Sequence, residues 1–566
     1  MKSLRFLLLF VGVLAVTCLV AQAPKSQRFV LLEEFTSTTC GPCAGVNPTL
    51  HSLQVNNPTK FTSIYYHVNW PAPGDPMNLH NPAETAARVS YYGVSYVPYG
   101  RLDGNYWSGN PSGLNINIIN TRYAMPSPME MDLQHQLSAG NDSIFVTMLL
   151  KATDNIAAGN IAAHNVVIEK HIHFNSAPGS NGEKDFYNVM KKMLPGSSGT
   201  KIEQAMAPGD YIILENAWKL ANVYDINELA AVGFVQNNGN KEIFQTANSS
   251  TSAPTPLYDN DAEILLIDKV SPTNCLGQVS PRIKVRNNGS SNLSSLLIKY
   301  QVNDGTPMEY TWNGSVDFLN KFNITLPAYS FTVAPQNELK VYISQVNGNN
   351  DEYPKNDTLT FDFEDGVQAE NVINVWIKTD NNPQETTWKI VDANGTTVGS
   401  GGPYATAGTL YKETVTLPTD DGCYSFFMFD AGANGLCCTN GMGFFTCFYG
   451  NNKVIAEGTT FGEEILAQFH IGSGVGILDK ADAGSLNISP NPAQDNVMVY
   501  VNLMNPTGAE LNIYDLRGQK VYHSTIATDG NQQQVIDLDL SGLSTGMYIA
   551  EVVSNGQVLR KKFTMK

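Results

Sequence analysis

Two cysteines separated by a Gly-Pro pair are the residues of this sequence best placed to do chemistry. Cys40-Gly41-Pro42-Cys43 follows an apolar stretch at 29–35 that predicts a β-strand, and precedes a short helix predicted at 46–53. The free backbone amides and the dipole at a helix N-terminus stabilise an anion, which favours the thiolate form of Cys40. Cys40 would then be the nucleophile and Cys43, in the first turn, the resolving thiol. This placement predicts thiol–disulfide exchange by a redox-active disulfide, with no other cofactor.

The same pair of cysteines allows two other interpretations. Cys40 and Cys43 could form a static disulfide, or they could bind zinc. A structural zinc site needs four ligands, and no second CxxC or pair of histidines lies nearby. Elsewhere, Glu169, His171 and His173 alternate along a predicted strand and share one face, but no third histidine accompanies them. No metal site is therefore expected, while a static disulfide stays open.

The elements that must position the cysteines alternate between strand and helix over residues 24–125. After the helix at 46–53, the pattern predicts a strand at 61–68, a helix at 84–92, a strand at 94–97 and a closing helix near 114–119. Alternation of this kind predicts an α/β domain.

This segment resembles thioredoxin in more than its CxxC. Pro48 lies five residues after Cys43, where thioredoxin has the proline of its active-site helix. Glu34 stands six residues before Cys40, at the place of the family's buried acid, and Pro98 matches the register of its cis-proline. The resemblance implies a thioredoxin-like fold, in which Glu34 exchanges protons with the resolving cysteine and Pro98 aligns a substrate strand.

The composition places the whole chain among folded, β-rich proteins. Of its 566 residues 42% are hydrophobic and 15% are charged, and at about 150 residues per domain this length predicts roughly four domains. The net charge of −17 would repel a phosphate backbone, which excludes nucleic acid as a partner. The 47 glycines and 29 prolines indicate many short turns between strands.

The N-terminus has the pattern of an export signal. Lys2 and Arg5 precede an apolar run at 6–20 and small residues at 21–23. Export puts the mature chain in an oxidising compartment, where cysteines pair. Cys275 is left without an assigned partner. Structural disulfides are expected among the four late cysteines, with the adjacent pair the least favoured because of strain: Cys423, Cys437, Cys438 and Cys447.

The C-terminus resembles a sorting domain. The runs at 488–492, 511–518 and 540–548 and the basic end at 561–566 look like the type A sorting domain of the type IX (Por) secretion system. The resemblance implies recognition by that secretion machinery, export across the outer membrane, and a final place at the cell surface or in the medium. The first 250 residues also resemble the outer membrane protein 28-related family.

The expected fold class is multidomain, with an α/β thioredoxin-like N-terminal domain followed by a β-rich or α+β domain and immunoglobulin-like β-sandwich modules. One helix, at 186–194, is predicted within the second domain. The predicted boundaries are 1–23 for the signal peptide, 24–125 for the thioredoxin-like domain, 126–254 for the β-rich α+β domain, 255–364 for the immunoglobulin-like sandwich, 365–472 for the cysteine-containing sandwich, 473–484 for a linker and 485–566 for the sorting domain.

Two functions from different classes fit these features. The first is a secreted, cell-surface thiol–disulfide oxidoreductase or isomerase, which would act on protein thiols and disulfides through Cys40 and Cys43. The alternative is a surface adhesin or binding protein, in which the thioredoxin-like fold is a scaffold without turnover and the β modules bind a surface ligand. Because fold does not fix function, the sequence leaves open whether the chain is an enzyme.

Overall fold

The chain divides into two compact units, Met1–Thr255 and Pro256–Lys566, in a computed structural model. The structure describes residues 26–418, 422–438, 440–450, 453–472, 484–489, 493, 496–503, 508–515, 517–526, 533–540, 542–554 and 557–565. The predicted signal peptide and nearly all of the predicted linker lie outside these residues. Among the helices that are described, none combines the length and the apolar character that a membrane crossing requires.

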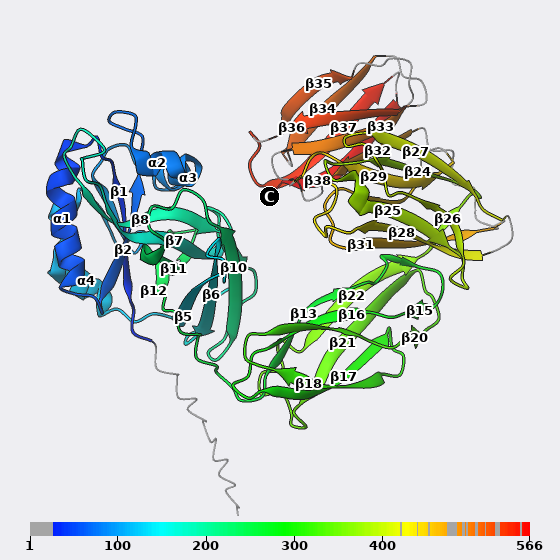
Figure 1. The fold of residues 1–566 in the computed structure, drawn as a ribbon, viewed down its shortest axis with the longest axis horizontal. Coiled ribbons are helices and arrows are strands. Elements are labelled where there is room, and N and C mark those ends of the chain that lie inside the picture. Colours follow the sequence, from blue (N-terminus) through cyan, green and yellow to red (C-terminus); the bar gives the residue numbers. More distant parts are fainter. Residues whose placement is uncertain are drawn as a thin grey trace, which may run out of the picture. The chain divides into compact units, whose positions relative to one another are not determined.

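Unit 1 is built on one nine-stranded sheet (Figure 1). Its order is β12 (Ile243–Asn248), β11 (Leu229–Asn237), β7 (Ile161–His173), β8 (Asp185–Leu194), β2 (Phe61–His67), β1 (Val30–Thr36), β3 (Tyr99–Leu102) and β4 (Trp107–Gly109), and β9 (Thr200–Ile202) pairs with β7. Strand β1 runs parallel to β2 and antiparallel to β3. Because both neighbours hydrogen-bond to it and both faces are covered, β1 is buried along its whole length.

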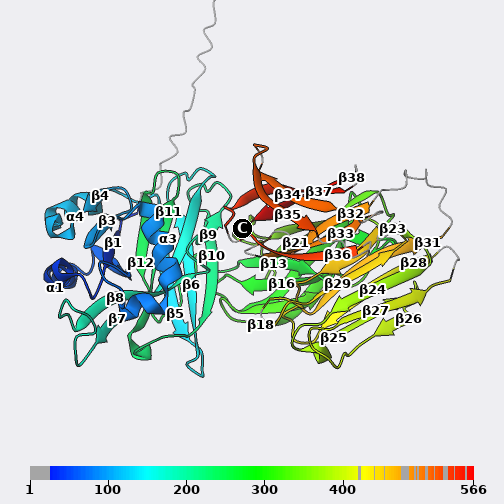
Figure 2. The ribbon, with the colours of Figure 1, turned by 90° about the horizontal axis from the view of Figure 1, so that it is seen from above.

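The two faces of β1 belong to different cores. Val30 and Leu32 pack with Leu50 of α1 (Gly41–Val55) and Ile119 of α4 (Ile116–Tyr123). Leu31, on the alternate face, joins the core that contains the C-terminal end of α3 (Pro82–Tyr92). Short α2 (Pro76–His80) directly precedes α3. Figures 1 and 2 show α1 and α4 at the opposite end of unit 1 from a second sheet, formed by β10 (Tyr211–Lys219), β6 (Ser143–Ala152) and β5 (Met129–Leu137).

The expected fold class is wrong for the N-terminal region. Residues 24–125 do not form a separate α/β thioredoxin-like domain, because β1 to β4 share one sheet with β7, β8, β11 and β12 from the following 130 or so residues. The described chain is mostly β-strand, and its four α helices all lie in unit 1. The local elements nevertheless form near their predicted places: α1 contains the helix predicted at 46–53, and α3 contains the one predicted at 84–92.

Two local predictions are wrong. The helix expected at 186–194 is the strand β8, which lies in the middle of the sheet between β7 and β2 and buries most of its side chains. Its apolar residues happen to be spaced as on a helix face, but burial on both sides of a strand needs no strict alternation. The strand expected at 94–97 does not form, and the strand there begins after Pro98, as β3.

Unit 2 consists of three consecutive β-sandwiches, each with its own apolar core. The first sandwich holds β13 (Ala262–Asp268), β14 (Thr273–Asn274), β15 (Gln278–Val279), β16 (Arg282–Asn287), β17 (Leu293–Val302), β18 (Met308–Val316), β19 (Lys321–Thr325), β20 (Tyr329–Ser330), β21 (Gln336–Val346) and β22 (Thr358–Asp365). The second holds β23 (Val367–Ala369), β24 (Val372–Lys378), β25 (Thr386–Val391), β26 (Thr397–Gly401), β27 (Leu410–Thr416), β28 (Gly422–Asp430), β29 (Phe444–Tyr449), β30 (Lys453–Gly458) and β31 (Glu464–Ile471). The third holds β32 (Gly484–Ser489), β33 (Asn496–Leu503), β34 (Ala509–Asp515), β35 (Lys520–Ile526), β36 (Gln533–Asp539), β37 (Gly546–Ser554) and β38 (Gln557–Met565).

Candidate functional site

Cys40 and Cys43 form a disulfide at the N-terminus of α1. Cys40 is the N-cap residue, and its sulfur accepts a hydrogen bond from the backbone N–H of Cys43 at 3.2 Å. Pro42 in the first turn suits this position, because a proline there gives up an N–H that has no partner within the helix. The helix amides and dipole therefore point at the Cys40 sulfur, as the spacing predicted.

Both cysteines are buried, as expected for Cys43 but not for Cys40. Cys40 is 1% exposed and Cys43 is fully covered. The connection between β7 and β8, residues 174–184, which we call the β7–β8 connection, packs against the turn that holds Cys40. Its backbone touches the turn before Cys40: Asn181 N–H donates to the Thr38 carbonyl at 3.0 Å, and a Cβ on Gly179 would lie 2.3 Å from that oxygen. Only glycine permits this approach without a shift of the backbone.

Asn181 ties the β7–β8 connection to the cysteines themselves. Its side-chain amide donates to the carbonyl oxygens of Ser37, at 3.2 Å, and Cys40, at 3.3 Å. The turn that leads from β1 into α1 is thus held by a residue more than a hundred positions later in the chain.

Asp75, the N-cap residue of α2, holds the same turn through further hydrogen bonds. Asp75 accepts a hydrogen bond from the Thr38 N–H at 2.7 Å and lies 2.8 Å from the Nδ1 atom of His67, and both side chains are buried. Burial alone would raise the pKa of Asp75, but the charge of His67 and the hydrogen bonds from His67 and Thr38 lower it to about 2. Asp75 is therefore an anion at neutral pH, and it fixes the Thr38 amide.

Glu34 lies on the face of β1 that also carries Val30 and Leu32, the face covered by α1. The residue is fully buried, and neither carboxyl oxygen has a hydrogen-bond partner among the described residues. Burial, and next the charge of Glu183, raise the pKa of Glu34 well above its usual value. The carboxyl group of Glu34 therefore holds its proton to a higher pH than an ordinary glutamate does.

The adjacent acid, Glu33, has a different role on the opposite face. It forms a fully buried ion pair with Arg88 and accepts a hydrogen bond from the hydroxyl of Tyr92, both on α3. Because successive residues of a strand face opposite sides of the sheet, Glu33 forms a structural ion pair on one face, while Glu34 has no hydrogen-bond partner among the described residues on the other.

Pro98 lies where β3 begins, and the Val97–Pro98 peptide bond is cis. Register pairs Tyr99 with Phe35 and Gly100 with Glu34. Pro98 thus stands beside the end of β1, from which the turn to Cys40 departs. The structure therefore brings together Cys40, Cys43, Glu34 and Pro98 around one end of β1, together with three residues that sequence reasoning missed: Asp75, Asn181 and Glu183.

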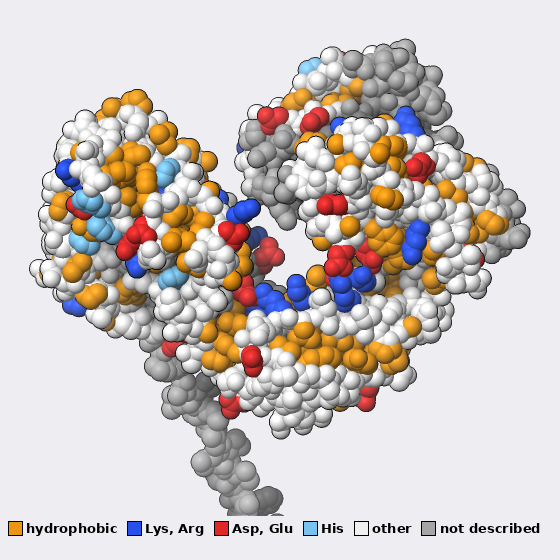
Figure 3. Space-filling view, viewed as in Figure 1, with side chains coloured by type: hydrophobic (Ala, Val, Ile, Leu, Met, Phe, Trp, Pro, Cys, Tyr) orange, Lys and Arg blue, Asp and Glu red, His pale blue; other side chains and the backbone are white. Residues whose placement is uncertain are grey.

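The alternating polar residues of β7 do not converge on one site. Glu169 is buried in an ion pair with Lys191 at 2.9 Å, and burial lowers the pKa of Lys191. His171 and His173 instead lie on the surface, each within 3.0 Å of Asp185. Figure 3 shows histidines gathered on the visible face of unit 1. Over the described part of the chain, no group of three or more metal-binding side chains forms.

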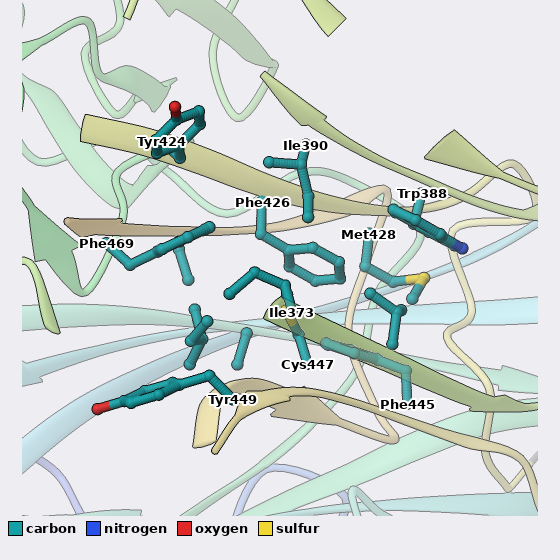
Figure 4. Packing of buried hydrophobic residues seen from close by; sticks show 14 of the residues in the cluster. Ile373, Trp388, Ile390, Tyr424, Phe426, Met428, Phe445, Cys447, Tyr449 and Phe469 are labelled. Atoms are coloured by element: carbon teal, nitrogen blue, oxygen red, sulfur yellow. The ribbon is translucent and has the colours of Figure 1, made fainter. Parts of the chain in front are cut away.

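The late cysteines are paired differently from the sequence expectation. Cys423 bonds to Cys275, so that one disulfide joins the first and second sandwiches of unit 2. Cys437 bonds to Cys438, the pairing that the strain argument made least favoured. Cys447 is free and buried in the core of the second sandwich, where burial raises the pKa of its thiol (Figure 4). Hydrogen bonds hold the segment around Cys275 close to Cys423. The Thr273 hydroxyl and the Cys275 N–H donate to Gln468 of β31, and β31 pairs with β28, the strand that contains Cys423.

Comparison with known proteins identifies the C-terminal region. Residues 487–566 match the secretion system C-terminal sorting domain of the Por type. No curated protein matches the chain. The chain therefore carries a sorting domain that interacts with the type IX secretion machinery, and it is exported across the outer membrane to the cell surface or the medium. The family match does not extend to the first 250 residues, and nothing in the comparisons supports the resemblance to the outer membrane protein 28-related family.

Solved structures give weaker likenesses. HBP35 of Porphyromonas gingivalis is 13% identical, with a TM-score of 0.32, and the match covers 60% of this chain and 98% of that one. Dimeric latent PorU from the same organism is 12% identical, with a TM-score of 0.19, over 57% of this chain and 36% of that one. A tetra-tandem repeat of a large adhesion protein is 12% identical, with a TM-score of 0.13, over 77% of this chain and all of the repeat. TM-scores this low do not establish a shared overall fold.

Proposed function

We propose that this exported protein exchanges thiols and disulfides with other proteins through Cys40 and Cys43. One observation carries the proposal: the disulfide spans the N-cap and first turn of α1, with the Cys40 sulfur aligned on the Cys43 amide. After reduction, the same amide and the helix dipole would stabilise the Cys40 thiolate, which is the attacking and leaving form of a cysteine. A purely static bridge needs no such placement.

The burial of both cysteines supports an exchange site that a substrate reaches only after a local rearrangement of the chain. Burial of Cys40 would slow the attack of small oxidants and unrelated thiols on the sulfur, since exchange needs access as well as thiolate. A substrate must therefore displace part of the β7–β8 connection. The unpaired acid Glu34 stands on the face of β1 that packs against α1, where it can serve proton transfer.

A protein-substrate assay tests this proposal. The full-length chain should reduce insulin disulfides in the presence of a dithiol, and it should form mixed disulfides that are trapped by Cys43→Ser. Cys40→Ser should abolish both. The double variant Cys275→Ser/Cys423→Ser is the matched control, because it removes a disulfide from unit 2 and leaves unit 1 intact. Equal activity in Cys40→Ser and the parent chain would contradict the proposal.

A second candidate function is surface binding or adhesion, and the build of unit 2 favours it. Strand β18 is the edge strand of its sheet, and it carries the half-buried Trp312, whose ring lies 4.3 Å from that of Phe322 on β19. Figure 3 shows apolar side chains in a band over this sandwich. Trp312 and Phe322 both pack against the core of the first sandwich, so Trp312 offers only part of its ring at the edge of the sheet, and such rings with one apolar and one accessible side are enriched at recognition sites. Trp312→Ala would then weaken attachment of labelled protein to host or bacterial surfaces, and Cys40→Ser would not.

A further inference from the structure

Unit 1 contains a cavity of about 240 Å³ on the side of the large sheet that α3 covers. Its lining combines two buried side chains, those of His164 on β7 and Arg88 on α3, with the more accessible Ser197 and Ser198 from the turn between β8 and β9. Helix α1, which begins at the cysteines, packs on the other face of the sheet. The cavity is therefore separate from the disulfide site.

The imidazole ring of His164 is packed against two neighbours. His164 pairs in register with Phe234 of β11, and the two rings stack with their centroids 4.6 Å apart. Gly199 approaches the edge of the ring, because a Cβ on this residue would lie 2.8 Å from the Nδ1 atom of His164 and 2.6 Å from the Ala163 carbonyl oxygen. Because the φ of Gly199 is also +69°, this position requires glycine.

The two ring nitrogens of His164 have no hydrogen-bond partner among the described residues, although the residue is only 1% exposed. Burial, and next the charge of Arg88, lower the pKa of His164 well below its usual value, so the ring is neutral at neutral pH. A neutral imidazole has one nitrogen that donates a hydrogen bond and one that accepts. Leaving both unsatisfied costs folding free energy, which a phenylalanine of similar shape would not cost. The ring therefore needs a partner within the cavity.

The charge on the lining of the cavity is balanced. Arg88 donates through Nε to Glu33 at 3.0 Å, and through Nη1 to Gln236 at 3.1 Å. The remaining side chains of the lining carry no charge. An ionic ligand would lose its hydration without meeting an unpaired opposite charge, so this lining favours a neutral ligand.

The accessible part of the lining offers groups that donate and accept hydrogen bonds. Ser197 and Ser198 carry hydroxyl groups, and the side chain of Asn238 is oriented by the Tyr91 hydroxyl, which donates to its Oδ1 atom at 2.9 Å. A hydroxyl group on the ligand matches this set and the imidazole, because one oxygen atom can both donate and accept. The cavity has roughly eight times the volume of about 30 Å³ that one water takes in the liquid, which is room for a single sugar ring.

We propose that this cavity binds a small neutral polyol of the size of one sugar ring, through the imidazole of His164 and the hydroxyl groups of Ser197 and Ser198. The bound polyol would satisfy the buried ring, which explains why a histidine stands where a phenylalanine would fit. The proposal does not depend on the exchange of disulfides by Cys40 and Cys43.

Saturation-transfer-difference NMR of the full-length chain tests this proposal. The probes are D-glucose and D-galactose, each compared with its uronate, which has the same ring and a carboxylate. At least one of the two neutral sugars should bind to the parent chain, and it should bind at least tenfold more weakly to His164→Phe. The double variant Ser197→Ala/Ser198→Ala should also bind it more weakly. His173→Phe, on an exposed histidine of the same strand, is the matched control and should bind as the parent chain does.

Hydrogen exchange of β7 peptides shows whether His164→Phe folds. This variant should be protected at least as well as the parent chain, because a phenyl ring still stacks on Phe234 and has no nitrogen to leave unsatisfied. A loss of protection would mean that the imidazole has partners within the folded chain, and it would overturn the proposal. Equal binding by the parent chain and His164→Phe, or tighter binding of a uronate than of its neutral sugar, would do the same. If neither neutral sugar binds, the cavity holds water only, and the proposal is wrong.

Discussion

The side-chain amide of Asn181 donates to the carbonyl oxygen of Cys40 across a separation of 141 residues. This contact shows that the cysteine turn is completed by a part of the chain that lies beyond the α/β pattern around it. The same segment supplies Gly179 against Thr38 and Glu183 between Asn47 and Asn181. We therefore expect this connection, between two strands in the middle of the large sheet, to limit access to the disulfide.

The first prediction concerns this cover. Asn181→Ala removes the hydrogen bonds to Ser37 and Cys40, and it should increase several-fold the rate at which a thiol reagent modifies Cys40 in the reduced, folded chain. Rates of iodoacetamide labelling, read by mass spectrometry, check this expectation. Asn117→Ala, at an exposed position of α4, serves as the control.

A backbone variant should act in the same direction. Gly179→Ala would place a Cβ 2.3 Å from the Thr38 carbonyl oxygen and push the β7–β8 connection away, whereas Gly196→Ala meets no atom within 4 Å. Faster labelling of Cys40 in Gly179→Ala but not in Gly196→Ala would support the expectation that the β7–β8 connection limits access to Cys40. Unchanged labelling in both Asn181→Ala and Gly179→Ala would show that this segment does not limit access.

The second prediction concerns the buried acid. The pKa of Glu34 is raised in the folded chain, so its contribution to stability is greatest at low pH and is lost as pH rises from the unfolded towards the folded pKa. Glu34→Gln should therefore stabilise unit 1 relative to the parent chain by about 1.4 kcal/mol for each pH unit in that interval.

Hydrogen exchange of β1 peptides at increasing urea concentrations, at pH 5 and pH 8, measures this difference. Glu130→Gln, on an exposed residue of β5, is the matched control. A Glu34→Gln variant whose advantage over the parent does not grow between the two pH values would contradict a raised pKa.

The third prediction concerns the free cysteine. Cys447 lies fully buried in the core of the second sandwich, so a thiol reagent should not modify it in the folded chain, and should modify it after unfolding in denaturant. Peptide mapping of labelled protein distinguishes these states. Labelling of Cys447 under native conditions would mean that this sandwich opens readily.

The fourth prediction concerns export. Phe563 is buried in the third sandwich, and Phe563→Ala should destabilise that sandwich by about 3–5 kcal/mol through the cavity it leaves. If the secretion machinery recognises the sorting domain in its folded form, protein with this substitution should accumulate in the periplasm. Lys562→Ala, on the exposed face of the same strand, should be exported normally. Fractionation of cells and medium measures both, and normal export of Phe563→Ala would show that the fold of this sandwich is not required.

The site was predictable where its signal is local. Cys40, Pro42 and Cys43 mark a helix N-terminus by their spacing alone, and the structure has α1 begin there. Asn181 and Glu183 left no such signal, because their contacts with the cysteine turn depend on the pairing of β7 with β8 and of β8 with β2. Strand β8 was itself mistaken for a helix, since Phe186, Met190 and Met193 follow a helical spacing while the sheet buries both of its sides.

The same limit applies to the disulfides. The last four cysteines lie close together in the sequence, which favoured disulfides among them. Cys423 instead forms a disulfide with Cys275 of the preceding sandwich, and Cys447 is a free thiol in the apolar core of the second sandwich. Pairings set by packing between modules are not visible in the order of residues along the chain.

The Cys275–Cys423 disulfide would have a mechanical consequence wherever the two ends of unit 2 are pulled apart, as on attachment to a cell surface. Its two cysteines are 148 positions apart, so tension along the backbone of unit 2 would pass through the sulfur–sulfur bond and bypass the loop it closes. The chain between the two cysteines, which would measure roughly 500 Å at about 3.4 Å per residue when fully extended, therefore does not lengthen under tension. Shear from moving fluid would load the bridge covalently, and the chain between Cys275 and Cys423, which holds β15 to β27, would not extend until that bond was reduced.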